Sequence, residues 1–239
     1  MGRLYVVGIG PGGIRDMTAR AAGILKECEV IAGYDRYIDR IRQDFQGKEW
    51  LCTGMAGEEE RCRRALETAS QGRRTALISG GDPGIYGMAS LALSLSLEYP
   101  GVEIEILPGL TAATAGAALL GAPIANDLAV ISLSDYHVSW EQIAQRLRLA
   151  AQGDFCIVLY NPASRARPDS LKKACGILRE SLPEDRLCAL AHQIGREGER
   201  TELCTLGRLS ALKADMSSTV FIGNSRTREI NGYMVTPRL

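Results

Sequence analysis

The sequence lacks an excess of either charge. Lysine and arginine together number 28 among 239 residues, and aspartate and glutamate also number 28. A chain without net charge creates no long-range field that would draw it to a nucleic acid or an anionic membrane surface. Hydrophobic residues make up 46% and charged residues 23%, which is ordinary for a folded globular protein. Any polyanionic ligand must therefore be held by a local group of basic residues.

Recognisable metal-binding and disulfide patterns are missing as well. The seven cysteines are scattered, form no C-x-x-C pair and are odd in number. The two histidines, His137 and His192, belong to no H-x-x-x-H or H-x-E pattern. We therefore expect neither a metal site nor a disulfide framework.

A third absence concerns targeting segments. The N-terminus leads straight into a predicted strand, without the charged segment, apolar segment and cleavage site of a signal peptide. The stretch 109–125 is too short, and too rich in glycine, alanine and threonine, to span a bilayer. We therefore expect a cytoplasmic protein with reduced thiols.

What is present is an alternation of short apolar runs with longer helical patterns, which indicates an α/β fold with mainly parallel strands. The length fits one large domain or two small ones, and we take residues 121–127 as a linker. We predict two open α/β domains, residues 1–121 and 122–239. The predicted strands are residues 4–7, 30–32, 75–78, 104–107, 129–133, 155–160, 187–191 and 218–222, and the predicted helices of the first half are 18–26, 59–70 and 86–98.

Turns rich in glycine or proline directly follow strands in both halves. They are GIGPGG, SGGDPG and LPGLTA in the first half, and YNPAS and GNS in the second. Ligands of open α/β sheets collect beyond the carboxyl ends of the strands. We therefore expect an active-site cleft where the two halves meet.

The first turn, GIGPGG at residues 8–13, formally matches the dinucleotide fingerprint G-x-G-x-x-G. A dinucleotide loop offers backbone N–H groups to a pyrophosphate, and Pro11 has none. The motif alone therefore leaves a dinucleotide site open without favouring it.

Two further small-residue segments follow in the first half. In SGGDPGIYG, residues 79–87, the paired glycines allow a ligand to lie against the backbone, and Asp82 either accepts from a ligand or caps its own turn. In LPGLTAATAGAALLG, residues 107–121, the lack of bulky side chains suits either close helix packing or a flat ring such as adenine. Local chemistry leaves both choices open.

The second half carries its basic residues after YNP. Arg165, Arg167, Lys172 and Lys173 form either a solvated helix start or a group that binds carboxylates, for which arginine has a suitable forked geometry. His137, in SDYHVSW, is either a proton carrier near neutral pH or an incidental loop residue.

The order of the segments GIGPGG, VIAGYDRY, GGDPGIY, PGLTA and YNP resembles that of the tetrapyrrole methylase family. The stretches VISLSDYHVSWEQIAQRL, VLYNPASRARP and TVFIGNSRTR look most like the precorrin-3B C17-methyltransferases of that family, which act in cobalamin biosynthesis. The resemblance covers residues 3–228. It implies two α/β domains with the active site between them, a homodimer, and S-adenosylmethionine as the methyl donor.

The resemblance also implies which residues bind the donor. A sulfonium donor needs no phosphate cradle, only a pocket that points its methyl group in line at the acceptor carbon. In this family the glycine-proline loop lines the cleft, so Pro11 is expected there. The implied donor contacts are Pro11, Gly80, Gly81, Asp82, Ile85, Thr111, Ala112, Asn161 and Gly195.

The reaction implied is methylation of C17 of a precorrin-3 type tetrapyrrole, coupled to contraction of the ring. Contraction needs a base near C20, and the candidates are Asp35, Asp135 and His137 in that order, since Asp35 matches an aspartate suggested as a proton acceptor in related uroporphyrinogen methylases. The substrate either contains cobalt already or is metal-free. The residues expected to engage its acetate and propionate groups are Arg36, Arg40, Arg165, Arg167 and Arg226.

Other functions stay open. A nicotinamide-dependent oxidoreductase is supported by the glycine fingerprint and by Asp35 at the position of a ribose-binding acid. Methylation at C11 or C20 of the macrocycle would use the same donor motifs. A relative acting on RNA or a translation factor suits the charge balance less well, and a binding module without catalysis would leave the two donor loops unexplained.

Overall fold

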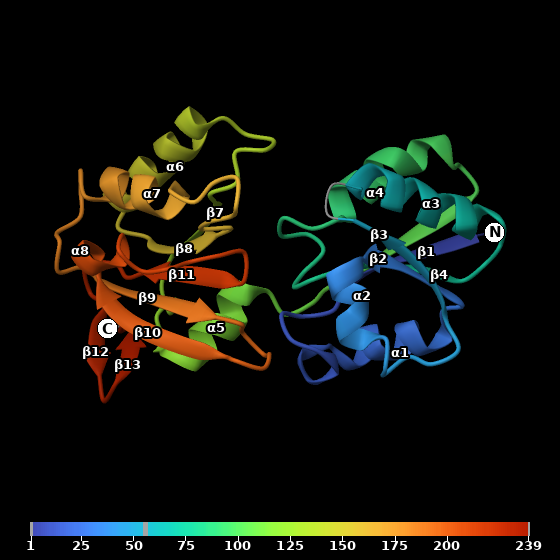
Figure 1. Ribbon diagram of the computed structural model, residues 1–239, viewed down its shortest axis with the longest axis horizontal. Helices are drawn as coiled ribbons and strands as arrows, with labels where there is room; N and C mark the ends of the chain where they lie inside the picture. Colours follow the sequence, from blue (N-terminus) through green and yellow to red (C-terminus); the bar gives the residue numbers. More distant parts are fainter. Residues whose placement is uncertain (1, 55–56, 239) are drawn as a thin grey trace. The chain divides into compact units, whose positions relative to one another are not determined.

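In the computed structural model, which describes residues 2–54 and 57–238, the chain divides into two units, Met1–Thr111 and Ala112–Leu239. Figure 1 labels their elements. Within the described residues, no helix combines the length and the apolar character needed to cross a bilayer.

The first unit is built on a five-stranded sheet with the order β3-β2-β4-β1-β5. Every neighbouring pair is parallel, so all five carboxyl ends lie at one edge. The inner strands are apolar along nearly their whole length because both faces of the sheet are covered. The strands are β1 (Gly2–Gly8), β2 (Val30–Tyr34), β3 (Glu49–Thr53), β4 (Thr75–Ser79) and β5 (Val102–Leu107).

Helices cover the two faces of this sheet in pairs (Figure 1). Tyr5 and Val7 of β1 pack toward α1 and α2, whereas Leu4 and Val6 pack toward α3 and α4, as expected from the two-residue period of a strand. The helical segments are η1 (Ile14–Asp16), α1 (Ala19–Glu27), α2 (Asp35–Ile41), α3 (Glu58–Ser70), α4 (Ala89–Leu95) and η2 (Ser96–Glu98).

The second unit is built on a mixed sheet with the order β10-β9-β11-β8-β7. Only β7 and β8 pair in parallel, while β11 is antiparallel to both β8 and β9, and β10 is antiparallel to β9. The carboxyl ends of β7, β8 and β9 therefore share an edge with the amino ends of β10 and β11. The strands are β7 (Leu128–Ser132), β8 (Cys156–Tyr160), β9 (Leu187–His192), β10 (Arg200–Thr205) and β11 (Ser218–Ile222).

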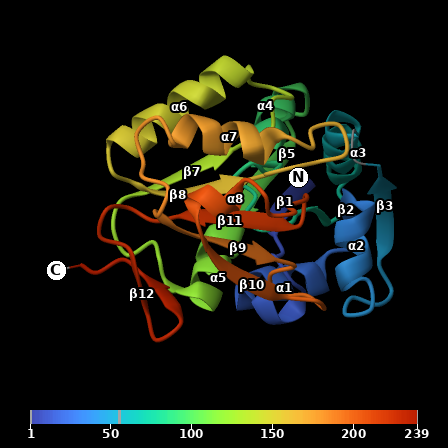
Figure 2. The ribbon, with the colours of Figure 1, turned by 60° about the vertical axis from the view of Figure 1, so that its left-hand side comes forward.

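One face of this mixed sheet packs against α6 (Trp140–Gln152), α7 (Ser170–Leu178) and α8 (Leu206–Leu209), and the other packs against α5 (Ala112–Leu120) (Figure 2). A small three-stranded sheet joins β6 (Gly121–Ala122) to the hairpin of β12 (Arg228–Ile230) and β13 (Tyr233–Val235).

Helix packing explains the lack of a side chain at Gly116. A Cβ atom on Gly116 would lie 2.9 Å from the side chains of both Ile194 and Phe221, so α5 approaches the sheet more closely than larger residues would allow. The first unit accordingly ends at Thr111 and α5 belongs to the second, whereas the sequence suggested a boundary after Gly121.

Candidate functional site

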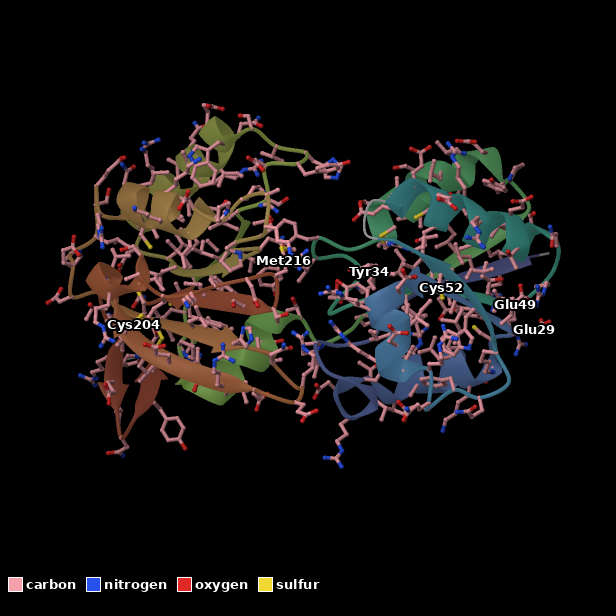
Figure 3. All side chains as sticks on the ribbon, viewed as in Figure 1. Glu29, Tyr34, Glu49, Cys52, Cys204 and Met216 are labelled. Atoms are coloured by element: carbon pink, nitrogen blue, oxygen red, sulfur yellow. The ribbon has the colours of Figure 1, made fainter. Side chains whose placement is uncertain are left out.

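Loops at the carboxyl edge of the first sheet carry most of the predicted donor residues. Pro11 follows β1, Gly80, Gly81 and Asp82 follow β4, and Thr111 follows β5. Tyr34, at the carboxyl end of β2, marks this edge in Figure 3. The opposite edge is marked by Glu29 and Glu49, which pair with Arg73 at 3.9 and 2.7 Å.

The loops after β1 and β4 are hydrogen-bonded to each other. The Gly10 N–H donates to the Gly81 carbonyl at 3.2 Å, and the Gly81 N–H donates to the Gly10 carbonyl at 2.9 Å. The Ile9 N–H donates to the Ser79 carbonyl at 3.0 Å. Both glycines have left-handed φ angles, 73° and 75°, which other residues adopt only at a cost.

The loop after β5 packs directly on these two. A Cβ atom on Gly109 would lie 2.2 Å from the Gly81 carbonyl oxygen, and one on Gly8 would lie 2.6 Å from the Gly109 nitrogen. These glycines are therefore required by the contact of one backbone with another.

Asp82 joins two of the loops through its carboxylate. Oδ1 accepts from the Gly84 N–H at 2.8 Å, and Oδ2 accepts from the Gly109 N–H at 3.0 Å. The side chain thus caps its own turn, as one interpretation of the sequence expected, and also anchors the PGLTA loop. Ile85 follows in this turn with its side chain partly exposed.

Gly80 and Pro11 are linked through Tyr37 and Arg40. A Cβ atom on Gly80 would lie 2.7 Å from Cζ of Tyr37, so the ring occupies the space that the missing side chain leaves. The Arg40 guanidinium lies 5.0 Å from the centre of that ring and donates to the Pro11 carbonyl at 3.4 Å. Arg40, expected to bind a substrate carboxylate, is thus already engaged within the unit.

Asp35 and Arg36 start α2 at the same edge, and both are exposed. An acidic residue in the first turn is favoured by the helix dipole. Neither side chain forms a hydrogen bond or ion pair with any other residue that the structure describes. Both are therefore available to a ligand.

Arg61 of α3 is a buried cation that the sequence analysis missed. Its side chain donates to the Thr53 hydroxyl at 2.7 Å and to the Gly54 carbonyl at 2.9 Å, and lies 5.9 Å from the centre of the Tyr34 ring. No carboxylate among the described residues pairs with it. The available signal was a charged residue on the buried stripe of α3, which also contains Ala65.

In the second unit, Asn161 lies at the carboxyl end of β8 with a left-handed φ of 53°. Its Nδ2 donates to the Ser132 hydroxyl at the end of β7 at 2.9 Å. The Tyr160 hydroxyl accepts from the Ala113 N–H at 2.7 Å and so anchors the start of α5, where predicted donor residue Ala112 lies.

The loop after β7 brings Asp135 to Arg167. Oδ1 of Asp135 lies 3.5 Å from Nε of Arg167, whose Nη1 donates to the Leu133 carbonyl at 2.9 Å. A predicted base and a predicted carboxylate-binding residue are thus paired with each other. The exposed His137 ring stacks edge-on against Tyr136 at 4.7 Å, and Arg165 is exposed.

Gly195 lies in the turn after β9 with a φ of 70°. Its N–H donates to Oε2 of Glu199 at 2.6 Å. The adjoining His192, which the sequence analysis noted only as lacking a metal pattern, is 8% exposed at the end of β9.

Arg226 does not join this group. It follows β11, which runs antiparallel to β8 and β9, so its turn lies at the opposite edge of the sheet from Asn161 and Gly195. The Gly223 N–H donates to the carbonyl of Leu187, the first residue of β9. Mainly parallel strands were expected, and a parallel β11 would have placed the GNS turn at the same edge as YNP.

Among the described residues, no three histidine, cysteine, aspartate or glutamate side chains are grouped so as to hold a metal ion. All seven cysteines are free thiols.

Comparison with known proteins gives one consistent family. The profile of tetrapyrrole (corrin/porphyrin) methylases matches residues 3–210. Over 236 residues the chain is 42% identical to the "Probable cobalt-factor III C(17)-methyltransferase" of Salmonella typhimurium strain LT2, covering 98% of both chains.

Two further relatives agree. The "Cobalamin biosynthesis protein CbiHC" of Archaeoglobus fulgidus is 42% identical over 238 residues, which are 99% of this chain but 52% of that protein, so the chain spans about half the length of this relative. The solved structure of "the methyltransferase CobJ" has a TM-score of 0.94 and 37% identity, and covers 99% of this chain and 100% of that one.

Proposed function

This chain belongs to the tetrapyrrole methylase family, and from that premise we propose that it transfers a methyl group from S-adenosylmethionine to C17 of a precorrin-3 type tetrapyrrole in cobalamin biosynthesis. The transfer is coupled to contraction of the macrocycle.

The observation that carries this proposal is how the loop after β1 uses its backbone. The Ile9 N–H is bonded to Ser79 at the end of β4, the Gly10 N–H is bonded to Gly81 in the loop after β4, and Pro11 has no N–H. The helix α1 starts only at Ala19, and the Thr18 hydroxyl accepts from the Ala21 N–H at its N-terminus. The N–H groups of Ile9 and Gly10 are thus not available to a pyrophosphate, which argues against a nicotinamide-dependent oxidoreductase.

The donor binds against the loops that carry the predicted contacts. Gly81 lets it lie against the backbone, and Asp82 joins the loop after β4 to the loop after β5. Ile85 offers an apolar side chain that is 38% exposed, and Gly80 is the neighbouring donor contact. The other donor contacts are Pro11, Thr111, Ala112, Asn161 and Gly195.

The donor supplies an already activated methyl group, so the protein mainly has to position the reactants. C17 of the macrocycle attacks that methyl carbon as the carbon–sulfur bond breaks. Loss of the proton from the C20 hydroxyl then drives the bond migration that contracts the ring and leaves C20 as an attached acyl group. Asp35 accepts this proton, because its carboxylate is exposed and unpaired within the described residues, whereas Asp135 pairs with Arg167. His137 is the third candidate.

The substrate carboxylates bind first to Arg36 and Arg165. Both are exposed, and neither has an ion-pair partner among the described residues. Arg40 and Arg167 would first have to give up contacts to Pro11 and Asp135.

The protein acts as a homodimer in the cytoplasm. Exposed apolar side chains support self-association: Leu97 is 86% exposed and Leu93 47%, next to one another on the α4–η2 segment. Seven free thiols are in keeping with a reducing compartment. Light scattering after gel filtration tests the dimer, which should have twice the 25.8 kDa mass of the chain.

Turnover is the direct test of the function. Purified protein is incubated with S-adenosylmethionine and either precorrin-3B or cobalt-precorrin-3, and the product is followed by mass and absorption and its new methyl located by NMR. A methyl at C17 with a contracted ring is expected with one of them, which also identifies the metal state of the substrate. A methyl at C11 or C20 would assign a different member of the family, and binding of donor without turnover on either substrate would refute the proposed acceptor.

The base assignment is tested by Asp35→Asn with Asp39→Asn as its matched control on the same helix. Both aspartates are exposed. We expect Asp35→Asn to lower kcat at least a hundredfold, within the range for general base catalysis, with the dissociation constant of S-adenosylhomocysteine unchanged. Asp39→Asn should have wild-type kcat. Undiminished turnover in Asp35→Asn would move the role to Asp135 or His137.

A further inference from the structure

His192 is a buried titratable residue that the proposed reaction does not use. It is the last residue of β9, flanked by β10 and β11, and it lies opposite Arg200 on one strand and Ser218 on the other. Only 8% of it is exposed.

One ring nitrogen faces two oxygens. Nδ1 lies 3.1 Å from the Ser218 hydroxyl and 3.4 Å from Oδ1 of Asp215. The Ser218 hydroxyl donates to Oδ1 of Asp215 and accepts from the Asp215 N–H, both at 3.1 Å. When the Ser218 hydroxyl proton points to Asp215, Nδ1 carries the ring proton and donates it, which leaves a lone pair on Nε2. The group is not a hydrolytic triad, because serine and aspartate meet the same nitrogen rather than opposite ones.

The segment of residues 215–218, which contains Asp215 and Ser218, also holds the turn that follows His192. The Gln193 N–H donates to the Ser217 carbonyl at 3.0 Å, and the Ser217 N–H donates to Oδ1 of Asp215 at 2.7 Å. Gln193 has a left-handed φ of 55°, which is costly for a residue with a side chain. Residues 215–218 thus fix both His192 and the turn that leads to Gly195.

The charges that face His192 come from three places. Burial lowers its pKa and is the largest effect. Asp215, before β11, opposes this, whereas Arg200 of β10 and Arg196 of the intervening loop lower the pKa further. A second ring proton would place a charge where burial and two arginines disfavour it. Nε2 has no hydrogen-bond acceptor among the described residues and is not one of their fully buried polar atoms without a partner, so solvent is the partner toward which a protonated ring would turn.

We propose that His192 is a positioning residue for methyl transfer: the neutral ring keeps residues 193–195 in the conformation that binds the donor, and protonation releases them. This inference rests on the proposed function, in which Gly195 contacts S-adenosylmethionine.

The test compares two titrations of the intact protein. Imidazole signals are followed by NMR between about pH 5 and 8, where histidine titrates, with His137→Gln assigning the two resonances. The dissociation constant of S-adenosylhomocysteine is measured over the same range by calorimetry. We expect affinity to fall at least tenfold on acidification, with its midpoint at the pKa of His192.

Three variants distinguish positioning from a purely structural role. Asp215→Asn, at a side chain that is 58% exposed, should lower the His192 pKa and move the binding midpoint to lower pH by the same amount. Asp185→Asn, its exposed control, should move neither. His192→Gln should weaken binding at neutral pH and remove this pH dependence.

The proposal would be overturned by equal affinity for S-adenosylhomocysteine across the pH range. It would also be overturned if Asp215→Asn shifts the His192 pKa and leaves the binding midpoint unchanged. Both outcomes can be measured even if His192→Gln does not fold. Absence of donor binding at every pH would instead overturn the proposed function, and this inference with it.

Discussion

At the scale of single residues, the loops after β1, β4 and β5 are held by backbone contacts and one carboxylate. The Asp82 carboxylate bridges the loop after β4 and the loop after β5. Its two hydrogen bonds involve an ionised acceptor, and such bonds contribute about 1.5–3 kcal/mol each.

We therefore expect Asp82→Ala to lower the free energy of unfolding by about 3–6 kcal/mol and to weaken S-adenosylhomocysteine binding at least tenfold. Urea unfolding and calorimetry measure the two effects. Asp44→Ala, at an exposed position of the same unit, is the control and should change neither. Wild-type donor affinity in Asp82→Ala would show that the loops keep their shape without the carboxylate.

Gly109 gives a sharper test because a methyl group has no room there. Gly109→Ala should disrupt the loop and abolish donor binding, since the new Cβ would lie 2.2 Å from the Gly81 carbonyl oxygen. Gly23→Ala is the matched control: nothing lies within 4 Å of its Cβ position inside α1, so it should stabilise the protein by about 0.5–1 kcal/mol. Full donor binding by Gly109→Ala would contradict the packing described here.

Individual site residues were predictable where a motif fixes them and not where two distant segments meet. The glycines of GIGPGG and GGDPG follow from turn chemistry. The ion pair of Asp135 with Arg167 does not, because 31 intervening residues must fold before the charges meet. The burial of Arg61 could not be predicted either, because a single charged residue in an amphipathic pattern is normally taken to face solvent.

At the scale of elements, apolar runs located the inner strands well, and β4, β5, β8 and β11 lie close to their predicted bounds. The edge strands β3 and β10 were missed because polar residues leave each of them with only a short apolar run, and pairing with a neighbouring strand makes them regular. The helix predicted for 86–98 begins at Ala89, since Tyr86 has a left-handed φ of 53°. Periodicity also says nothing about direction, so the antiparallel β11 and the resulting place of Arg226 could not be predicted from it.

Helix α1 offers a prediction at this scale. Its N-cap Thr18 accepts from the Ala21 N–H at 3.1 Å, and Ala21 and Leu25 are buried. Thr18→Ala should lower the free energy of unfolding by about 1 kcal/mol. Thr18→Ser keeps the hydroxyl and should therefore keep most of the stabilisation that the N-cap contributes. Urea denaturation compares the two, and equal losses would mean that the threonine methyl, rather than its hydroxyl, is responsible.

At the scale of the whole molecule, thiol reactivity reports on both units at once. Cys52 is half-buried, and the other six cysteines are buried. Burial raises the pKa of Cys28 and Cys62 to about 12, and those of Cys175 and Cys204 to about 11. Figure 3 shows Cys52 in the first unit and Cys204 in the second.

Because the thiolate is the reactive form, a disulfide reagent at neutral pH should modify one thiol quickly and the rest only on unfolding. Mass mapping should place the fast label on Cys52, and Cys52→Ser should remove the fast phase. A second fast thiol in either unit would reveal local opening that the burial of these side chains does not anticipate.

The position of β1 has a consequence for synthesis on the ribosome. β1 lies between β4 and β5 in its sheet, yet it leaves the exit tunnel well before either of them. Its apolar side chains, including Leu4 and Val6, therefore have no complete surface to bury against until residues 75–107 have emerged. β6 similarly waits for β13. Translation pauses between β1 and β4 should therefore prolong the time that β1 is open to chaperones, while pauses after β5 should not.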